Sequence, residues 1–119
     1  MDPRLLRGVD EFNAARFFRA HEMWEELWLE TVGPEKRLLQ GLVQIAAGYA
    51  KVESGLCSGA LKLLSRGLGL VSEYLPGFSG LLLESFVVAV EEDIQRLRIT
   101  PDSAVSLATV QPPQLSIEG

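Results

Sequence analysis

The stretch "ARFFRAHEMWEELWLET", residues 15–31, predicts an amphipathic helix on which the rest of the fold is built. At 100° per residue, one face of this helix carries several of its large apolar side chains together with the only histidine of the chain. These residues are Phe17, Ala20, His21, Trp24, Leu27 and Trp28. Gly33 and Pro34 follow and predict the end of the helix.

Helical periodicity continues on both sides of this stretch. We expect helices that begin at Pro3 and end near residue 13, and that cover 34–54, 60–75 and 80–98, with turns at 54–59 and 75–80. Strand signals are weak, because the chain has no sustained alternation and no Asn-Gly or Asp-Gly turn. The predicted fold is all-α, a single domain of four to five antiparallel helices packed as αα-hairpins into a helical bundle.

The C-terminal residues differ from the helical part. The segment 99–119 is poor in charge and interrupted by prolines. The sequence therefore predicts a helical domain over residues 1–98 and an extended or disordered tail over residues 99–119.

Composition limits the classes of partner. A net charge of −5, with scattered basic residues, argues against nucleic acid as a partner. The longest apolar runs have about five residues, whereas a membrane span needs roughly 20, so we expect no membrane insertion. The single cysteine, Cys57, cannot form an internal disulfide, and the first residues lack a signal-peptide pattern. These features predict a cytoplasmic protein.

His21 and Glu25 are the leading candidates for chemistry. They are four residues apart, so one helical turn brings them to the same side, and Glu22 is adjacent. The pair could serve as metal ligands or as an acid and base. A metal would need further donors, drawn from Glu53, Glu73, Glu91, Glu92 and Asp93. The spacing matches neither the zinc-protease pattern nor the di-iron pattern. The alternative is a partly buried histidine bonded to Glu25 or to a backbone carbonyl.

Other polar and aromatic residues have similar alternatives. Trp24 and Trp28 are core anchors or, in an open pocket, ligand-stacking rings. Gln40 and Gln44 could face solvent, a partner or a pocket. Cys57 is expected to be an unreactive thiol, because the only possible histidine base is His21. The run "EED" at 91–93 is expected to be a solvated face, and Gly67 and Gly69 predict close helix packing or a weakened helix.

Three stretches together resemble domain-of-unknown-function family 309. They are "FNAARFFRAHEMWEELW" (12–28), "PEKRLLQGLVQIAAGY" (34–49) and "GALKLLSRGLGLV" (59–71). The resemblance covers about residues 5–97 and implies a small antiparallel helical fold without an established activity. It maps shared polar positions to Asn13, His21, Glu22, Glu25, Gln40 and Gln44. The chain departs from the pattern at Ala15, where a glycine is usual, and at Gly67 and Gly69, where better helix formers are usual.

No complete catalytic set is evident, so we expect a non-catalytic helical interaction or scaffold domain without a cofactor, and a homodimer. The alternative is a metal-dependent or acid–base enzyme, or a small-ligand binder, that uses His21 and Glu25. In that case Asn13, Gln40 and Gln44 would orient the substrate, and Trp24 or Trp28 would contact the ligand.

Overall fold

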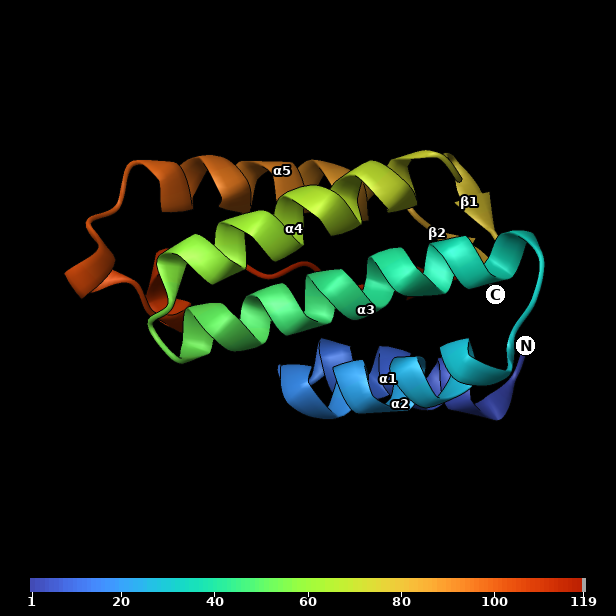
Figure 1. Cartoon of the computed structure of the whole chain (residues 1–119). Helices are drawn as coiled ribbons and strands as arrows, with labels where there is room; N and C mark the ends of the chain where they lie inside the picture. The colour runs from blue at the N-terminus through green and yellow to red at the C-terminus, as the bar shows by residue number, and fades with distance from the viewer. Residues whose placement is uncertain (119) are drawn as a thin grey trace.

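The computed structural model describes residues 1–118 and consists mainly of five helices (Figure 1). They are α1 (Pro3–Asn13), α2 (Phe17–Glu30), α3 (Pro34–Glu53), α4 (Cys57–Ser72) and α5 (Glu84–Arg98). Each helix packs mainly on its neighbours along the chain, so the all-α fold is confirmed. Figure 1 shows α3 and α4 side by side, with α1 and α2 on one flank and α5 on the other.

The helix ends follow local sequence signals. The Asp2 carboxylate accepts a hydrogen bond from the Arg4 amide and caps α1, which has Pro3 in its first turn. Gly33, with φ of 80°, makes the turn into Pro34 at the start of α3. The predicted limits of the central helices, 15–31 and 34–54, therefore differ from the observed limits by two residues or fewer.

A small antiparallel sheet was not predicted. Strands β1 (Gly77–Phe78) and β2 (Leu81–Leu82) form a hairpin, and β3 (Ser116–Ile117) pairs with β2. Ser79 and Gly80 have φ of 52° and 84°, and two positive values are typical of a type I′ hairpin turn. The hairpin occupies residues expected to begin the last helix, so α5 starts at Glu84 rather than near residue 80. Similarly, α4 starts at Cys57, within the segment expected to be a turn.

Phe12 lies at the centre of an aromatic core. Its ring lies 5.2 Å from Phe17, 5.8 Å from Trp24, 5.8 Å from Tyr49 and 5.6 Å from Phe86, measured between ring centroids. All five side chains are buried. One residue near the end of α1 thus connects α2, α3 and α5 through ring contacts.

The segment after α5 returns along the bundle. It contains two short 3-10 helices, Asp102–Ala104 and Leu107–Thr109, before β3. Figure 1 shows it passing behind α3 and α4 to end beside the hairpin. Val105, Val110 and Leu115 are buried and belong to the main hydrophobic cluster. The division into a helical domain of residues 1–98 and a separate tail stays a prediction.

Within residues 1–118, none of the helices combines the length and the apolar character that a membrane crossing requires.

Candidate functional site

The predicted pair of His21 and Glu25 does come together on α2. His21 Nε2 lies 2.9 Å from Glu25 Oε2. The His21 side chain is 24% exposed and that of Glu25 is 49% exposed, so the pair lies at the edge of the core rather than inside it. The Phe18 ring stacks on the imidazole with centroids 5.7 Å apart. The other imidazole nitrogen, Nδ1, is buried without a hydrogen-bond partner.

The surroundings of this pair offer little chemistry. Among residues 1–118, no three histidine, cysteine, aspartate or glutamate side chains lie close enough together to hold a metal ion. Neither His21 nor Glu25 lines either of the two main cavities of the described chain. An imidazole paired to a carboxylate can accept or donate a proton, but neither of these two cavities would hold a substrate against it. The geometry is that of an i,i+4 contact between two side chains of one helix.

Glu22 is separated from the pair. It is exposed and lines a cavity of about 500 Å³ between α1 and α2, together with charged side chains of both signs. Within this cavity, Arg16 Nε lies 2.5 Å from Glu11 Oε2, and this contact raises the pKa of Arg16 and lowers that of Glu11. The charges largely satisfy one another, so the cavity offers no concentrated charge to a ligand.

The two tryptophans have different environments. Trp24 is fully buried and donates a hydrogen bond from Nε1 to the Leu5 carbonyl at 3.2 Å. Gly8 allows this approach, because a Cβ there would lie only 2.0 Å from Trp24 Nε1. Trp28 is half-buried, its Nε1 has no partner, and Lys36 Nζ lies 4.4 Å from its ring centroid. The cation–π contact covers the one tryptophan ring that solvent reaches.

Asn13 has a structural connection to the C-terminal segment. Its side-chain amide donates to the Leu115 carbonyl at 3.0 Å, and its side-chain oxygen accepts from the Leu115 amide at 2.7 Å. The Gln114 side chain also donates to the Asn13 carbonyl at 3.0 Å. The Asn13 side chain therefore donates to and accepts from the Leu115 backbone in the way that a neighbouring strand would. Together with the Gln114 contact, it holds residues 114 and 115 against the end of α1.

The two glutamines of α3 are not equivalent. Gln40 is exposed, whereas Gln44 is half-buried and its side-chain oxygen is buried without a hydrogen-bond partner. Neither glutamine lines the main cavities. The six shared polar positions are consequently dispersed, with only His21 and Glu25 in direct contact.

Asp93 was expected to face solvent and was considered only as a possible metal donor, but it forms a buried polar cluster. The prediction that "EED" at 91–93 forms a solvated face is wrong for this residue, which is completely buried, although Glu91 and Glu92 are exposed. The Asp93 carboxylate accepts hydrogen bonds from Tyr49 Oη at 2.6 Å, Arg96 Nη1 at 2.7 Å and the Gln111 amide at 2.8 Å. Burial, with the adjacent carboxylate, raises the pKa of Tyr49, so its hydroxyl stays a donor. Asp93 directly precedes the apolar Ile94 in the sequence. Its position on the helix was therefore the signal from which its burial could have been predicted.

Cys57 is buried at the start of α4, and its thiol lies 3.7 Å from the Leu97 carbonyl. Burial, followed by the negative charge of Asp102, raises the pKa of the thiol. A protonated thiol is a poor nucleophile, in line with the expected inert role.

The larger of the two cavities lies elsewhere, at the end of the bundle where both termini, the hairpin and the α2–α3 turn meet (Figure 1). We call this space of about 700 Å³ the end cavity. Its lining residues are Met1, Asp2, Leu5, Leu6, Leu27, Thr31, Glu35, Leu38, Leu39, Leu42, Ser79, Gly80, Leu81, Ile117 and Glu118. None of the site residues proposed from the sequence is among them, because segments far apart in the chain build it.

Comparison with known families gave a match for the first part of the chain. A family model described as domain of unknown function (DUF309) matches residues 5–63, which span most of α1, all of α2 and α3, and the start of α4. A comparison with curated proteins gave no match. The matched region includes Asn13, His21, Glu25 and both glutamines, and the family description assigns no activity to them. Over residues 5–63 the protein therefore resembles the DUF309 family, as its sequence motifs predict.

Proposed function

We propose that the protein is a non-catalytic interaction domain that forms a homodimer through the outer face of α2. The supporting observation is the exposure of large apolar side chains on and beside one helix. Phe18 is 61% exposed, Leu29 is 67% exposed, and Val32 just beyond the helix is 85% exposed. Phe18 and Leu29 are eleven residues apart, which is close to three full turns, so they share one face.

This face suits a second copy of the same chain. Glu25 lies between Phe18 and Leu29 on the same stripe, so two α2 helices crossing in opposite directions near Glu25 would place apolar ends against each other. Phe18 of one protomer would then meet the Leu29 end of the other. His21 pairs with Glu25 at 2.9 Å and would moderate the approach of two Glu25 carboxylates at the centre of the interface.

The enzyme alternative is less well supported. It requires His21 and Glu25 to face a substrate, whereas the residues lining the two main cavities of the described chain do not include them. The pair is instead placed where a homodimer would cover it, which accounts for its position without a reaction.

We also propose the cytoplasm as the compartment of the protein. The support is a single, buried, reduced cysteine, which suits a reducing environment. Cell fractionation tests this proposal, and recovery outside the cytoplasm would contradict it.

Sedimentation equilibrium of the full chain tests the dimer. We expect a dimer at micromolar concentration and a shift towards monomer in Leu29→Glu, because four carboxylates would then crowd the interface. The matched control is Ile99→Glu, since Ile99 is 84% exposed but lies after α5, away from α2. A chain that remains monomeric at all concentrations, or an equal loss of dimer in both variants, would overturn the proposal. A monomer that turns over a substrate would overturn its non-catalytic part as well.

A further inference from the structure

The end cavity has predominantly apolar walls. Nine of the side chains that line it are aliphatic or methionine: Met1, Leu5, Leu6, Leu27, Leu38, Leu39, Leu42, Leu81 and Ile117. Apart from Met1, which precedes α1, they come from α1, α2, α3, β2 and β3, so the walls are fixed by several elements rather than by one helix face. A volume of about 700 Å³ lies in the usual range for small-molecule sites, roughly 300–1,000 Å³. The apolar part of a small ligand would find a preformed space here.

The charged side chains that line the same cavity carry one sign of charge, and the α-ammonium of Met1 lies near Asp2. Asp2, Glu35 and Glu118 line it, and among its lining residues there is no lysine, arginine or histidine. The hydroxyl of Ser79 donates to Glu35 Oε1 at 3.1 Å, which orients that carboxylate. The Arg4 backbone amide donates a hydrogen bond to the Asp2 carboxylate, and this bond lowers the pKa of Asp2.

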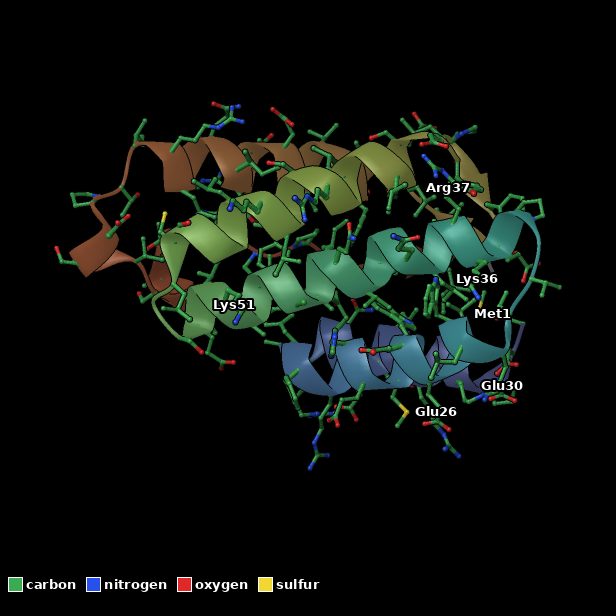
Figure 2. All side chains as sticks on the ribbon, viewed as in Figure 1. Met1, Glu26, Glu30, Lys36, Arg37 and Lys51 are labelled. Atoms are coloured by element: carbon green, nitrogen blue, oxygen red, sulfur yellow. The ribbon has the colours of Figure 1, made fainter. Side chains whose placement is uncertain are left out.

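The cations near this cavity act mainly on Asp2 or lie outside the cavity. The Arg4 guanidinium pairs with both Asp2 and Glu30, and Lys36 lies over the Trp28 ring. Arg4 and the Met1 α-ammonium offset the charge of Asp2, which leaves Glu35 and Glu118 as the main negative groups of the cavity. Figure 2 shows Met1, Glu30 and Lys36 at this end of the molecule and Lys51 at the opposite end of α3.

We propose that the end cavity binds a small amphiphilic cation, with its apolar body against the leucines and its ammonium group beside Glu35 and Glu118. An anionic amphiphile would bring a carboxylate or phosphate against these groups, and a neutral one would lose their attraction. This site is separate from the outer face of α2, so it does not depend on homodimerisation.

Three probes of equal chain length test the charge preference: n-octylammonium, n-octanol and octanoate. Binding to the full chain is measured by calorimetry and by NMR shifts of leucine methyl groups. We expect octylammonium to bind about tenfold more tightly than octanol, octanoate to bind most weakly, and added salt to reduce the difference. The methyl groups of Leu38, Leu39 and Leu81 are expected to shift, whereas those of the remote Leu64 in α4 stay unchanged.

Variants test the two parts of the site separately. Glu35→Gln and Glu118→Gln are each expected to weaken octylammonium binding by about two- to fivefold and to leave octanol binding unchanged. The matched control is Glu53→Gln, an exposed glutamate at the far end of α3, which should leave all three affinities unchanged. Leu6→Trp fills the cavity from α1 and should reduce binding of all three probes.

Several outcomes would overturn the proposal. Equal affinities for the three probes would show that the carboxylates do not contribute to binding. NMR shifts that also include the methyl groups of Leu64 would indicate non-specific binding. No detectable binding of octylammonium to the wild-type chain would reject the site, even if Leu6→Trp failed to fold. Binding of a basic apolar peptide in place of octylammonium would assign the cavity to a protein partner and reject the small cation.

Discussion

Ala15 adopts a backbone conformation that its side chain disfavours. Its φ of 61° lies in the left-handed region, and the residue forms the tight turn between α1 and α2. The turn is held by backbone bonds from the Ala15 amide to the Phe12 carbonyl at 2.9 Å and from the Arg16 amide to the Glu11 carbonyl at 2.8 Å. The family resemblance places a glycine at this position, and the structure supplies the physical reason for one.

Ala15→Gly is therefore expected to stabilise the protein by about 1 kcal/mol, because glycine adopts this conformation without a steric cost. Urea unfolding of the two proteins measures the difference. Ala14→Gly is the control, since φ of Ala14 is −90° and the added chain entropy should destabilise that variant by roughly 0.4–1 kcal/mol. A loss of stability in Ala15→Gly would contradict this explanation.

Asp93 concentrates three connections in one buried carboxylate. It joins α3 through Tyr49, its own helix through Arg96, and the C-terminal segment through the Gln111 amide. A buried charge is tolerated when it is paired and fully hydrogen-bonded, which this geometry provides.

Asp93→Ala is expected to cost about 3–5 kcal/mol, because it leaves buried donors without an acceptor. Thermal and urea unfolding measure the loss. Glu92→Ala removes a neighbouring carboxylate 3.5 Å from Arg96, but that side chain is 58% exposed, so a change below about 0.5 kcal/mol is expected. Equal effects of the two substitutions would show that burial of Asp93 contributes nothing.

The α3–α4 pair is held close by glycines. A Cβ on Gly67 would lie 2.6 Å from Ile45 Cγ1 and 2.7 Å from the Gly41 carbonyl oxygen. By contrast, a Cβ on Gly69, two residues along the same helix, would meet no atom within 4 Å. Of the two readings that the sequence left open, close packing applies to Gly67 and a weakened helix applies to Gly69.

Alanine substitutions at Gly67 and Gly69 should therefore change the stability of the protein in opposite directions. Gly67→Ala is expected to destabilise the protein by about 1–3 kcal/mol through overpacking, and Gly69→Ala to stabilise it by about 1 kcal/mol through helix propensity. Urea unfolding of both variants provides the comparison, and each serves as the control for the other. Changes of the same sign would reject the packing argument.

At the scale of the whole molecule, residues 99–118 pack against the helices. Val105, Val110 and Leu115 are buried, Asn13 binds the backbone of Leu115, and β3 completes the sheet. Two of the lining residues of the end cavity, Ile117 and Glu118, also come from this segment. Both the core and the proposed binding site thus extend beyond the helical region.

A chain ending at residue 98 is expected to lose about 3 kcal/mol or more of stability, because each of the three buried side chains contributes roughly 1.5–3 kcal/mol as an upper bound. Calorimetric unfolding compares it with the full chain. Gln111→Ala in the full chain is the control, since its backbone amide still reaches Asp93 and its side chain is exposed. An unchanged melting temperature after truncation would show that residues 99–118 are an independent tail.

The candidate site was only partly accessible from the sequence. The i,i+4 spacing of His21 and Glu25 correctly predicted their contact, because that distance depends on one helix alone. The end cavity could not be predicted, since it combines Leu5, Leu39 and Ile117 from distant parts of the chain. The burial of Asp93 depended likewise on Tyr49 and Gln111, which only packing brings to it.

The sequence by itself determined the helices, because apolar periodicity, Pro3, Pro34 and the turn glycines act within a few residues. It also determined which side of α2 enters the core through Trp24. The tertiary structure alone decided the hairpin, the path of residues 99–118 and the end cavity. The physical reason is the separation in sequence of the residues that interact. Helix periodicity is a local property, whereas the end cavity and the buried Asp93 carboxylate depend on contacts between residues about twenty to over a hundred positions apart.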